Sequence, residues 1–343
     1  MTTLDGRQGA EEPFGVGLIG SSATSRFVCE RLSLRSDLRL VATWSEEEQD
    51  EDRPLSHAGS SPAECRRHAT LFDVTQDPAV QFVHFAGGSQ ADWMRQALAA
   101  TKSIVVESPQ SLSLDELKQL ARDAAACRQT AAVYGPRRWE ADFLQARSAL
   151  EGGRLGKLLR VRYSVHDYRL PNETFPLGVD RELGWPVLDQ LLVLLDERPC
   201  RRFDWRHFPS DTDRSDGFVG RFDFADDVSA VVEVQTRSLL SYRSGWMLEG
   251  TAGACRNGRL YTRTLDGEII DEPLPTPRES SDPFFDALAS GLRGNANDLP
   301  TVSDAIRVEV LLASLPASGM MVHGKSGTNA TNGTNDRRDL SVP

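Results

Sequence analysis

Short apolar runs alternate with helical stretches from Phe14 onward, and this alternation constrains the fold more than any other feature of the sequence. The runs have the length of buried strands, and several of the segments between them place apolar residues at helical spacing. They cover residues 14–19, 38–43, 82–86, 103–106 and 130–134. Ser113-Leu-Asp-Glu116 matches a capping box at the start of a helix that we expect to end near Cys127. Strands that alternate with helices predict a parallel sheet covered by helices.

The pattern changes after residue 150, where apolar and polar residues alternate with a period of two. This period predicts an antiparallel sheet that packs one face and exposes the other to solvent. The segments that show it are 159–165, 218–224, 229–236 and 246–251. Two amphipathic segments, 282–292 and 303–315, are expected to be helices that cover this sheet or the domain boundary.

The two patterns predict an α/β protein of two domains, in line with a length of 343 residues. A Rossmann-type domain with a parallel sheet is expected over 14–137. An α+β domain for substrate binding or oligomerisation, built on a mostly antiparallel sheet, is expected over 138–323. Residues 1–13 are expected to be flexible, and the Asn/Gly/Thr-rich tail at 324–343 is expected to be disordered.

Charge and composition exclude several classes of function. A net charge of −11 makes the average surface repel the phosphate backbone of nucleic acid. The sequence contains neither the run of about 18 apolar residues that a membrane helix needs nor the apolar segment of a secretory signal, so we expect a cytoplasmic protein. The 5 cysteines lack C-x-x-C spacing, which argues against a zinc site and against a disulfide framework.

The turn after the first predicted strand is where a Rossmann-type domain binds phosphate. Such turns need G-x-G-x-x-G, but here the segment reads Gly20-Ser21-Ser22-Ala-Thr24-Ser25, with only the first glycine in place. Two interpretations stay open. The turn can have the Rossmann shape without binding a dinucleotide, or the helix N-terminus and the hydroxyl groups of Ser21, Ser22 and Thr24 can bind phosphate oxygens.

An acidic residue usually follows the second strand and binds the adenosine ribose, whereas proteins that bind NADP supply an arginine. Here Trp44 and Ser45 are followed by three glutamates, of which Glu46 is the first. Their carboxylates would repel a 2′-phosphate, so we expect NAD rather than NADP, with Ser45 and Glu46 near the ribose. The alternative is a solvated acidic loop without a binding role.

Several motifs resemble those of the glucose-fructose oxidoreductase, inositol dehydrogenase and MocA family. The segment 100–109, Ala-Thr-Lys-Ser-Ile-Val-Val-Glu-Ser-Pro, resembles the family's A-G-K-x-V-x-x-E-K-P signature, and Asp77-Pro-Ala-Val80 resembles its D-P-x-V segment. The resemblance extends over about 14–318. It implies a Rossmann-type domain followed by an α+β domain and nicotinamide-dependent chemistry on a sugar, inositol or polyol. Gly87 and Glu107 are then candidates for contact with the cofactor.

The resemblance also identifies substitutions at the family's catalytic positions. The lysine of E-K-P, whose charge favours an ionised substrate hydroxyl, is Ser108 here. The family's D-x-G-x-H-x-x-D motif resembles Asp189 to Asp196 in spacing, but its histidine is replaced by Val193 and its glycine by Leu191. Valine cannot transfer a proton, so the usual general base is missing.

Asp189 is a candidate substitute base, provided that burial raises its pKa. The alternative is a structural carboxylate that caps the helix or pairs with Arg181 or Arg201. Arg137-Arg138 resembles the family's R-R stretch near the active cleft, and two surface arginines are the alternative interpretation.

Four further residues carry side chains that can take part in chemistry. His166 and Tyr168 end the first strand of the second domain, where they are candidates for proton transfer, although both can equally be surface residues. Ser108 is kept as a candidate because its hydroxyl occupies the lysine position. His84, inside a buried strand, is expected to be a core histidine with satisfied hydrogen bonds.

Two functions therefore remain open. The first is NAD(P)-dependent oxidation or reduction of a CH–OH group in a sugar, inositol or related polyol. The second is a catalytically silent family member that uses its cleft to bind a ligand or a partner. In both, we expect a homo-oligomer formed through the C-terminal sheet, with no nucleic acid, membrane or metal as partner.

Overall fold

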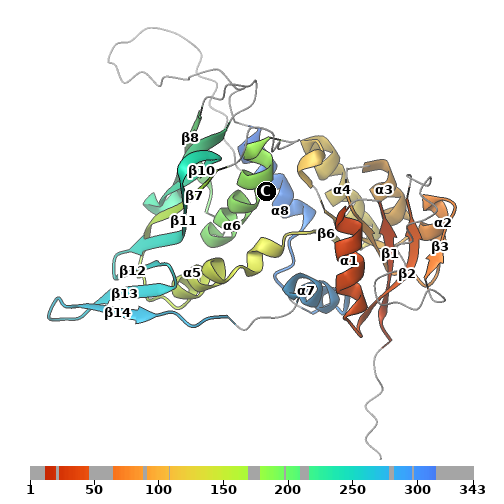
Figure 1. Cartoon of the computed structure of the whole chain (residues 1–343), viewed down its shortest axis with the longest axis horizontal. Helices are drawn as coiled ribbons and strands as arrows, with labels where there is room; N and C mark the ends of the chain where they lie inside the picture. Colours follow the sequence, from red (N-terminus) through yellow and green to blue (C-terminus); the bar gives the residue numbers. More distant parts are fainter. Residues whose placement is uncertain are drawn as a thin grey trace, which may run out of the picture. The chain divides into compact units, whose positions relative to one another are not determined.

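The computed structural model describes most of the chain in two compact units (Figure 1). The first unit comprises 1–135 and 281–306, and the second comprises 136–280 and 307–343. The residues that the structure describes are 12–20, 23–45, 65–87, 91–107, 109–168, 178–196, 198–208, 216–277, 282–295 and 297–313. The predictions of a flexible N-terminus and of a disordered tail therefore fall almost wholly outside the described residues.

The first unit is built on a six-stranded parallel sheet with the order β3-β2-β1-β4-β5-β6. The chain runs outward from β1 to β3 and then returns to β4 on the other side of β1, so the direction of winding switches between β1 and β4. The strands are β1 (Phe14–Ile19), β2 (Leu38–Trp44), β3 (Arg66–Arg67), β4 (Phe82–Phe85), β5 (Ser103–Val106) and β6 (Ala131–Val133). This order confirms the Rossmann-type prediction.

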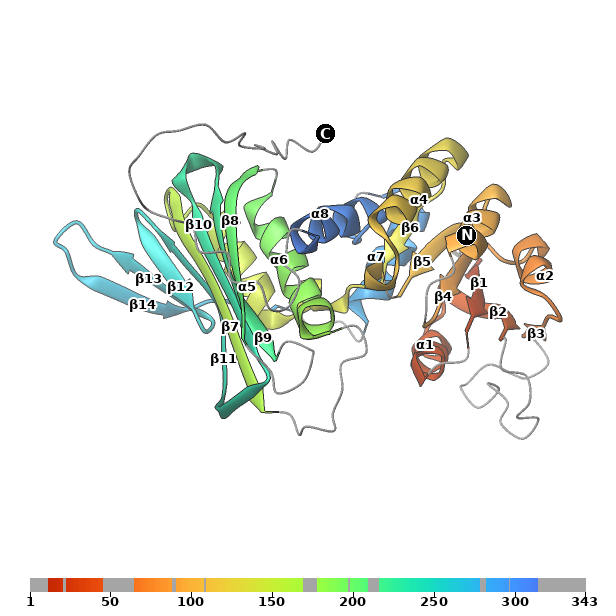
Figure 2. The same ribbon diagram turned by 90° about the horizontal axis from the view of Figure 1, so that it is seen from above.

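Helices cover both faces of this sheet (Figure 2). Phe284 of α7 packs against Tyr134 in an edge-to-face arrangement, with ring centroids 4.8 Å apart, on the face that α1 also covers. On the opposite face, a Cβ added to Gly17 would lie 2.8 Å from Val74 of α2, and α3 and α4 follow on this side. The helices are α1 (Ala23–Ser33), α2 (Leu71–Gln76), α3 (Ala91–Ala99), α4 (Leu114–Cys127) and α7 (Pro283–Leu292).

The predicted start of α4 is confirmed in detail. Ser113 Oγ accepts a hydrogen bond from the Glu116 amide at 3.3 Å, while Glu116 Oε2 accepts one from the Ser113 amide at 2.7 Å. Both bonds satisfy N–H groups that have no partner inside the helix, which is why the helix begins here. The hydrogen bonds from Ser113 also keep the pKa of the Glu116 carboxyl below its usual range.

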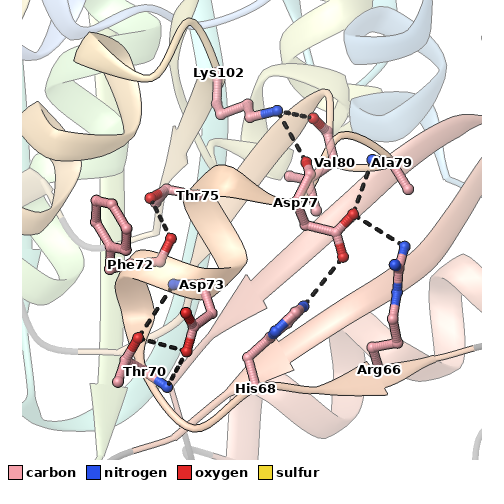
Figure 3. Close-up of polar contacts among 10 residues, drawn as sticks. All are labelled: Arg66, His68, Thr70, Phe72, Asp73, Thr75, Asp77, Ala79, Val80 and Lys102. Atoms are coloured by element: carbon pink, nitrogen blue, oxygen red, sulfur yellow. Dashed lines mark hydrogen bonds and ion pairs between the residues drawn. The ribbon is translucent and has the colours of Figure 1, made fainter.

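A network around Asp77 explains why two motifs that resemble those of the family lie where they do (Figure 3). Asp77 accepts hydrogen bonds from Arg66, from His68 and from the Ala79 amide at 3.0, 3.1 and 2.9 Å. Burial acts to raise the pKa of Asp77, but these bonds outweigh it and the pKa is lowered. Lys102 Nζ donates to the carbonyl oxygens of Asp77 and Val80, so the A-x-K motif closes the D-P-x-V turn.

The sequence patterns missed β3 and α2. A two-residue strand of exposed arginines has no apolar run to reveal it. Helix α2 spans only six residues and depends on its own capping box, in which Thr70 and Asp73 bond each other's backbone amides (Figure 3). Short helices of this kind are stabilised by tertiary contacts more than by intrinsic propensity.

The second unit is built on an eight-stranded sheet with the order β14-β13-β12-β11-β7-β10-β9-β8. All pairings are antiparallel except that of β7 with β10, so the mostly antiparallel prediction is confirmed. The strands are β7 (Leu158–Tyr168), β8 (Cys200–His207), β9 (Gly217–Phe224), β10 (Ser229–Gln235), β11 (Arg237–Gly250), β12 (Gly253–Arg256), β13 (Arg259–Arg263) and β14 (Ile269–Pro273).

Two helices pack on one face of the eight-stranded sheet (Figure 2). Trp246 of β11 lies at the centre of this face, where its ring is 4.9 Å from that of Tyr163 and 6.3 Å from that of Phe143. Phe143 belongs to α5 (Ala141–Glu151), and the second helix on this face is α6 (Trp185–Leu195). Side chains that alternate with these, such as Arg162 on β7, are exposed on the other face.

The last helix of the described residues is α8 (Val302–Leu312), which includes the point at which the chain passes from the first unit to the second. The sequence-based division placed 282–292 in the second domain, whereas the structure groups α7 with the first unit. Phe284 and Phe285 are both fully buried, and apolar periodicity alone cannot say which sheet such a helix covers. In the described residues, no helix is long and apolar enough to cross a membrane.

Candidate functional site

The turn after β1 lies at the point where the winding of the first sheet switches direction. Gly20 adopts a φ of +126°, and its amide donates to the Trp44 carbonyl at 3.1 Å. A Cβ added here would lie 2.0 Å from the Ala86 carbonyl oxygen, so any larger residue would displace the end of β4. The glycine is therefore required by the close approach of two strand ends.

A serine replaces the third glycine of the phosphate loop. Ser25 is fully buried in α1, and its hydroxyl donates to the Gly20 carbonyl at 3.0 Å. This bond closes the turn from within, in place of the close helix packing that glycine allows. Ser21 and Ser22 lie outside the described residues. Thr24 is in the first turn of α1, where the helix N-terminus offers unpaired N–H groups to an anion, but its side chain is not described.

Gly87 and Glu107, both predicted as cofactor contacts, are brought together at the ends of β4 and β5. The Gly87 amide donates to Glu107 Oε2 at 2.6 Å, and Gly87 adopts a φ of +91°. Burial raises the pKa of Glu107 to about 7, against the smaller, lowering effect of the Gly87 bond. This carboxyl can therefore gain or lose a proton near neutral pH, within the crevice where Rossmann-type domains bind ligands.

Tyr134 and His84 lie on the same face of the sheet as Glu107. Burial raises the pKa of Tyr134 to about 12, and the negative charges of Asp282 and Glu107 add to the effect. The His84 ring is 5.9 Å from that of Tyr134, and burial lowers the pKa of His84 to about 3. The expectation of a satisfied core histidine is wrong in one respect, because neither ring nitrogen has a hydrogen-bond partner among the described residues.

The end of β2 carries an aromatic side chain that the motif comparison passed over. Trp44 Nε1 donates to the Ala69 carbonyl at 3.2 Å, and the Trp44 ring meets that of Trp93 edge to face, with centroids 4.9 Å apart. Ser45 follows directly, while Glu46 lies outside the described residues. The signal in the sequence was a large aromatic residue as the last residue of a buried strand.

In the second unit, Asp189 is held by a bidentate ion pair. Arg138 Nε and Nη2 donate to its two carboxylate oxygens at 2.8 and 2.6 Å, and only 3% of Asp189 is exposed. Its partner is thus neither Arg181 nor Arg201, the two partners that the sequence suggested. Arg181 instead pairs with Glu309 at 3.1 Å. A guanidinium that bonds both oxygens stabilises the ionised carboxylate and opposes the uptake of a proton.

Gln190, the next residue of α6, makes a second set of polar contacts. Gln190 donates to the Arg137 carbonyl and accepts a hydrogen bond from Trp246 Nε1 at 3.0 Å. Leu191 is fully buried and Val193 is half-buried on α6. Arg137 and Arg138, which the resemblance placed near the cleft, therefore anchor α6 through a carbonyl oxygen and a guanidinium.

His166 lies on the other face of the eight-stranded sheet. Val161 and Tyr163 of β7 are buried beneath the helices, so His166, three residues beyond Tyr163, lies on the opposite face. Its Nε2 is 3.2 Å from a carboxylate oxygen of Glu233 on β10. The structure therefore does not bring His166 and Asp189 together. The Tyr168 side chain is not described, and Ser108 lies outside the described residues.

Comparisons with known proteins reveal relatives over parts of the chain. No family model matches. The uncharacterized oxidoreductase YhhX of Escherichia coli is 28% identical over 179 residues, which are 50% of this chain and 51% of YhhX. The scyllo-inositol 2-dehydrogenase (NADP(+)) IolW of Bacillus subtilis is 28% identical over 133 residues, 36% of this chain and 37% of IolW. An inositol 2-dehydrogenase of Gluconacetobacter diazotrophicus is 28% identical over 167 residues, 46% of this chain and 48% of that enzyme. The chain thus spans about half the length of these curated relatives, or less.

Solved structures share the fold over nearly the whole chain. A probable oxidoreductase, YhhX, superposes with a TM-score of 0.73 and 21% identity, covering 88% of this chain and 96% of its own. An NAD-binding protein from Listeria innocua superposes with a TM-score of 0.72 and 18% identity, covering 87% and 92%. These likenesses extend the agreement in fold to both units.

Proposed function

Because the chain belongs to the glucose-fructose oxidoreductase, inositol dehydrogenase and MocA family of oxidoreductases, we propose that it binds a nicotinamide dinucleotide and acts on a hydroxyl group of a sugar, inositol or related polyol. One observation carries the cofactor half of this proposal. Gly20 and Gly87, both with positive φ, follow β1 and β4 at the point where the winding switches, the position at which Rossmann-type sheets bind dinucleotides.

The described residues at this edge fit such a cofactor. Gly20 lets the first turn pass close to β4, and the N-terminus of α1 offers N–H groups to the diphosphate. Ser25 replaces a glycine without projecting into the crevice, because its hydroxyl bonds back to Gly20. The cofactor, when bound, supplies the acceptor or donor of a hydride. The protein must then hold the substrate and manage the proton that accompanies the hydride.

Glu107 is the group to which we assign this proton. Its carboxyl is bonded to Gly87 at the switch point, and its pKa of about 7 allows it to take up a proton near neutral pH. Asp189 is less suited to the task, because Arg138 occupies both its oxygens. Tyr168 stays as a candidate contact for substrate, and Ser108 as a candidate hydroxyl beside it. His166 lies on the uncovered face of the eight-stranded sheet and is not assigned to the substrate site.

The choice between NAD and NADP follows from charge. We propose NAD, because three glutamates follow Ser45 and their carboxylates would repel a 2′-phosphate. Arg67 argues for NADP instead. It is exposed at the end of β3, beside Thr43 of β2 in the sheet register, and its positive charge would attract a 2′-phosphate. Titration with both dinucleotides tests the choice directly.

A second function is favoured by the Asp189–Arg138 pair. It converts a candidate catalytic carboxylate into a buried structural contact, and Val193 and Ser108 replace the family's histidine and lysine. A catalytically silent protein that binds a dinucleotide or another ligand would tolerate all three changes. A silent protein that binds a dinucleotide would differ from the enzyme in turnover and not in cofactor binding.

The experiment that decides is isothermal titration with NAD and NADP, followed by a polyol panel in which formation of the reduced cofactor is read by fluorescence. The enzyme proposal expects binding of NAD and turnover of at least one sugar or inositol. Binding without turnover favours the silent protein. If neither dinucleotide binds at millimolar concentration, the cofactor proposal is wrong.

We further propose a cytoplasmic homo-oligomer that forms through the uncovered face of the eight-stranded sheet. Helices lie on only one face of this sheet in the described part of the chain, so the other face is left without helices. All five cysteines are free thiols, as is usual in a reducing compartment. Light scattering of the purified protein should give the mass of a dimer or a larger assembly, and a monomer would contradict the proposal.

A further inference from the structure

Two tryptophans at the end of β2 form a fixed aromatic surface. Trp44 is the last residue of β2, and Trp93 lies in the first turn of α3. Their rings meet at an interplanar angle of 82°, and the only polar atom of the Trp44 side chain is bonded to the Ala69 carbonyl. With its N–H satisfied and its edge packed, the Trp44 ring is held in one orientation.

Exposure separates these two side chains from the structural tryptophans of the second unit. Trp246, Trp185 and Trp205 are only 2%, 4% and 8% exposed, as expected for core residues. Trp44 and Trp93 are half-buried, so part of each ring remains available at the surface. A partly exposed aromatic ring offers a flat face to a ligand, which a ring enclosed in the core cannot do.

The position of the pair relates it to the switch point. Trp44 lies beside Ile19 in the sheet register, and its carbonyl accepts the hydrogen bond from the Gly20 amide. In Rossmann-type sheets a dinucleotide lies across the carboxyl ends of the strands, with its diphosphate at the first turn and its adenosine half over the end of the second strand. Trp44 is the residue at that end.

We propose that the Trp44–Trp93 pair is the surface on which the adenine ring of the bound nucleotide stacks. The inference rests on the proposed function and names the recognition of its adenosine half. Stacking of a base on an aromatic side chain needs no charge and no bare backbone. It thus offsets part of the affinity lost with two phosphate-loop glycines.

The test separates the two halves of the dinucleotide. ADP-ribose, which has the adenine, and nicotinamide mononucleotide, which lacks it, are each titrated calorimetrically into the parent protein and into Trp44→Leu and Trp93→Leu. Trp44→Phe keeps an aromatic face and is the conservative variant. Trp205→Phe removes a tryptophan from the second unit and is the matched control. Thermal melting of each variant without ligand reports whether it is folded.

We expect the Kd for ADP-ribose to rise about tenfold in Trp44→Leu and in Trp93→Leu, and threefold or less in Trp44→Phe. The control and all values for nicotinamide mononucleotide should stay within twofold of the parent. ADP-ribose should also quench tryptophan fluorescence in the parent and in Trp205→Phe, and much less in Trp44→Phe.

An unchanged Kd for ADP-ribose in folded Trp44→Leu and Trp93→Leu would show that the pair only fastens α3 to β2, which overturns the inference. If Trp44→Leu does not fold, Trp93→Leu and the quenching in Trp44→Phe decide in its place. Different outcomes would contradict the proposed function. Binding of ADP-ribose that depends on the two tryptophans, with no turnover of NAD, supports the inference and contradicts the enzyme; absence of all binding to the parent contradicts both.

Discussion

The carboxyl edge of the six-stranded sheet and helix α6 of the second unit have diverged from the family's pattern in different ways. At the sheet edge, Gly20 and Gly87 keep their positive φ angles, and Ser25 compensates for a lost glycine with a hydrogen bond inside the turn. On α6, the aspartate that remains is bonded by Arg138, and the histidine position holds a valine. The backbone geometry of a dinucleotide-binding turn is thus present at the sheet edge, while an ion pair and apolar packing occupy the α6 positions that resemble the family's catalytic ones.

The largest expected effect comes from restoring the missing chemistry. Ser108→Lys with Val193→His places a cation and an imidazole at the family's catalytic positions, and a general base contributes about 10² to 10⁴ in rate. We expect the turnover of NAD with an inositol to rise by at least 10² in the double variant, and by less in each single variant. Steady-state assays at a fixed, saturating NAD concentration measure it.

The control is Leu192→His together with Ser108→Lys. It adds the same two groups, but the imidazole then projects from a different side of α6. This variant should gain no more activity than Ser108→Lys alone. If the first double variant binds NAD normally and its turnover equals that of the parent, the comparison of α6 with the family motif is wrong.

The buried ion pair gives the next largest effect. Arg138→Met leaves the Asp189 carboxylate buried without its partner, which costs about 3–5 kcal/mol of unfolding free energy. Replacing both residues, as Arg138→Met with Asp189→Leu, removes the unpaired charge and should recover most of the loss. Urea unfolding followed by tryptophan fluorescence measures both. A loss below about 1 kcal/mol in Arg138→Met would mean that Asp189 accepts a proton easily, which restores it as a candidate base.

Gly20 offers a sharper view of the binding edge. Gly20→Ala imposes the cost of a positive φ on a residue with a Cβ and a clash with the Ala86 carbonyl, so we expect a loss of about 2 kcal/mol or more in stability. Gly267→Ala is a matched control, because Gly267 has a φ of +87° with nothing within 4 Å of the added Cβ. The control should lose about 1 kcal/mol.

Cofactor binding separates the two glycine variants further. The rise in melting temperature on addition of NAD should disappear in Gly20→Ala and persist in Gly267→Ala. Equal stability losses, with equal shifts on addition of NAD, would mean that the close approach of β1 and β4 plays no part in the site.

The fold was predictable where local patterns and global structure agree. β1 has the predicted bounds, and α4 runs from the capping box at Ser113 to Cys127 as expected. The short strands and hairpins of 253–273 were missed, because β12 and β13 each bury a single residue, Cys255 or Leu260, and β14 buries none, which is too few for a period-two pattern. Helix α7 was found, but its docking on the first sheet depends on contacts that its own sequence does not reveal.

The candidate site was predictable only where it follows from motifs. Gly87 and Glu107 come from strand ends that the spacing identifies, and the structure brings them into contact. Arg138 is 51 residues from Asp189, so no local pattern could select it over Arg181. The Trp44–Trp93 contact likewise joins a strand end to a helix 49 residues later, and only the fold brings the rings together.

The smallest effect that still distinguishes the two regions is the titration of Glu107. Its folded pKa, about 7, is above the ordinary value of 4.5, so the folded state binds the proton more tightly than the unfolded state. The stability that this proton contributes is complete below pH about 4.5 and is lost as the pH rises through 7. Because the carboxyl is partly exposed, the loss is about 1 kcal/mol once solvent screening is allowed for.

Glu107→Gln removes this titration and should flatten the stability curve between pH about 4.5 and 7, as measured by urea unfolding at several pH values. Glu116→Gln is the matched control, because the pKa of that carboxyl is shifted in the opposite direction by its capping bonds. If the slope of unfolding free energy against pH is unchanged in Glu107→Gln, the titrating group is another residue. If the pH dependence of NAD turnover also loses its inflection near 7 in this variant, the sheet edge supplies the proton chemistry that α6 no longer provides.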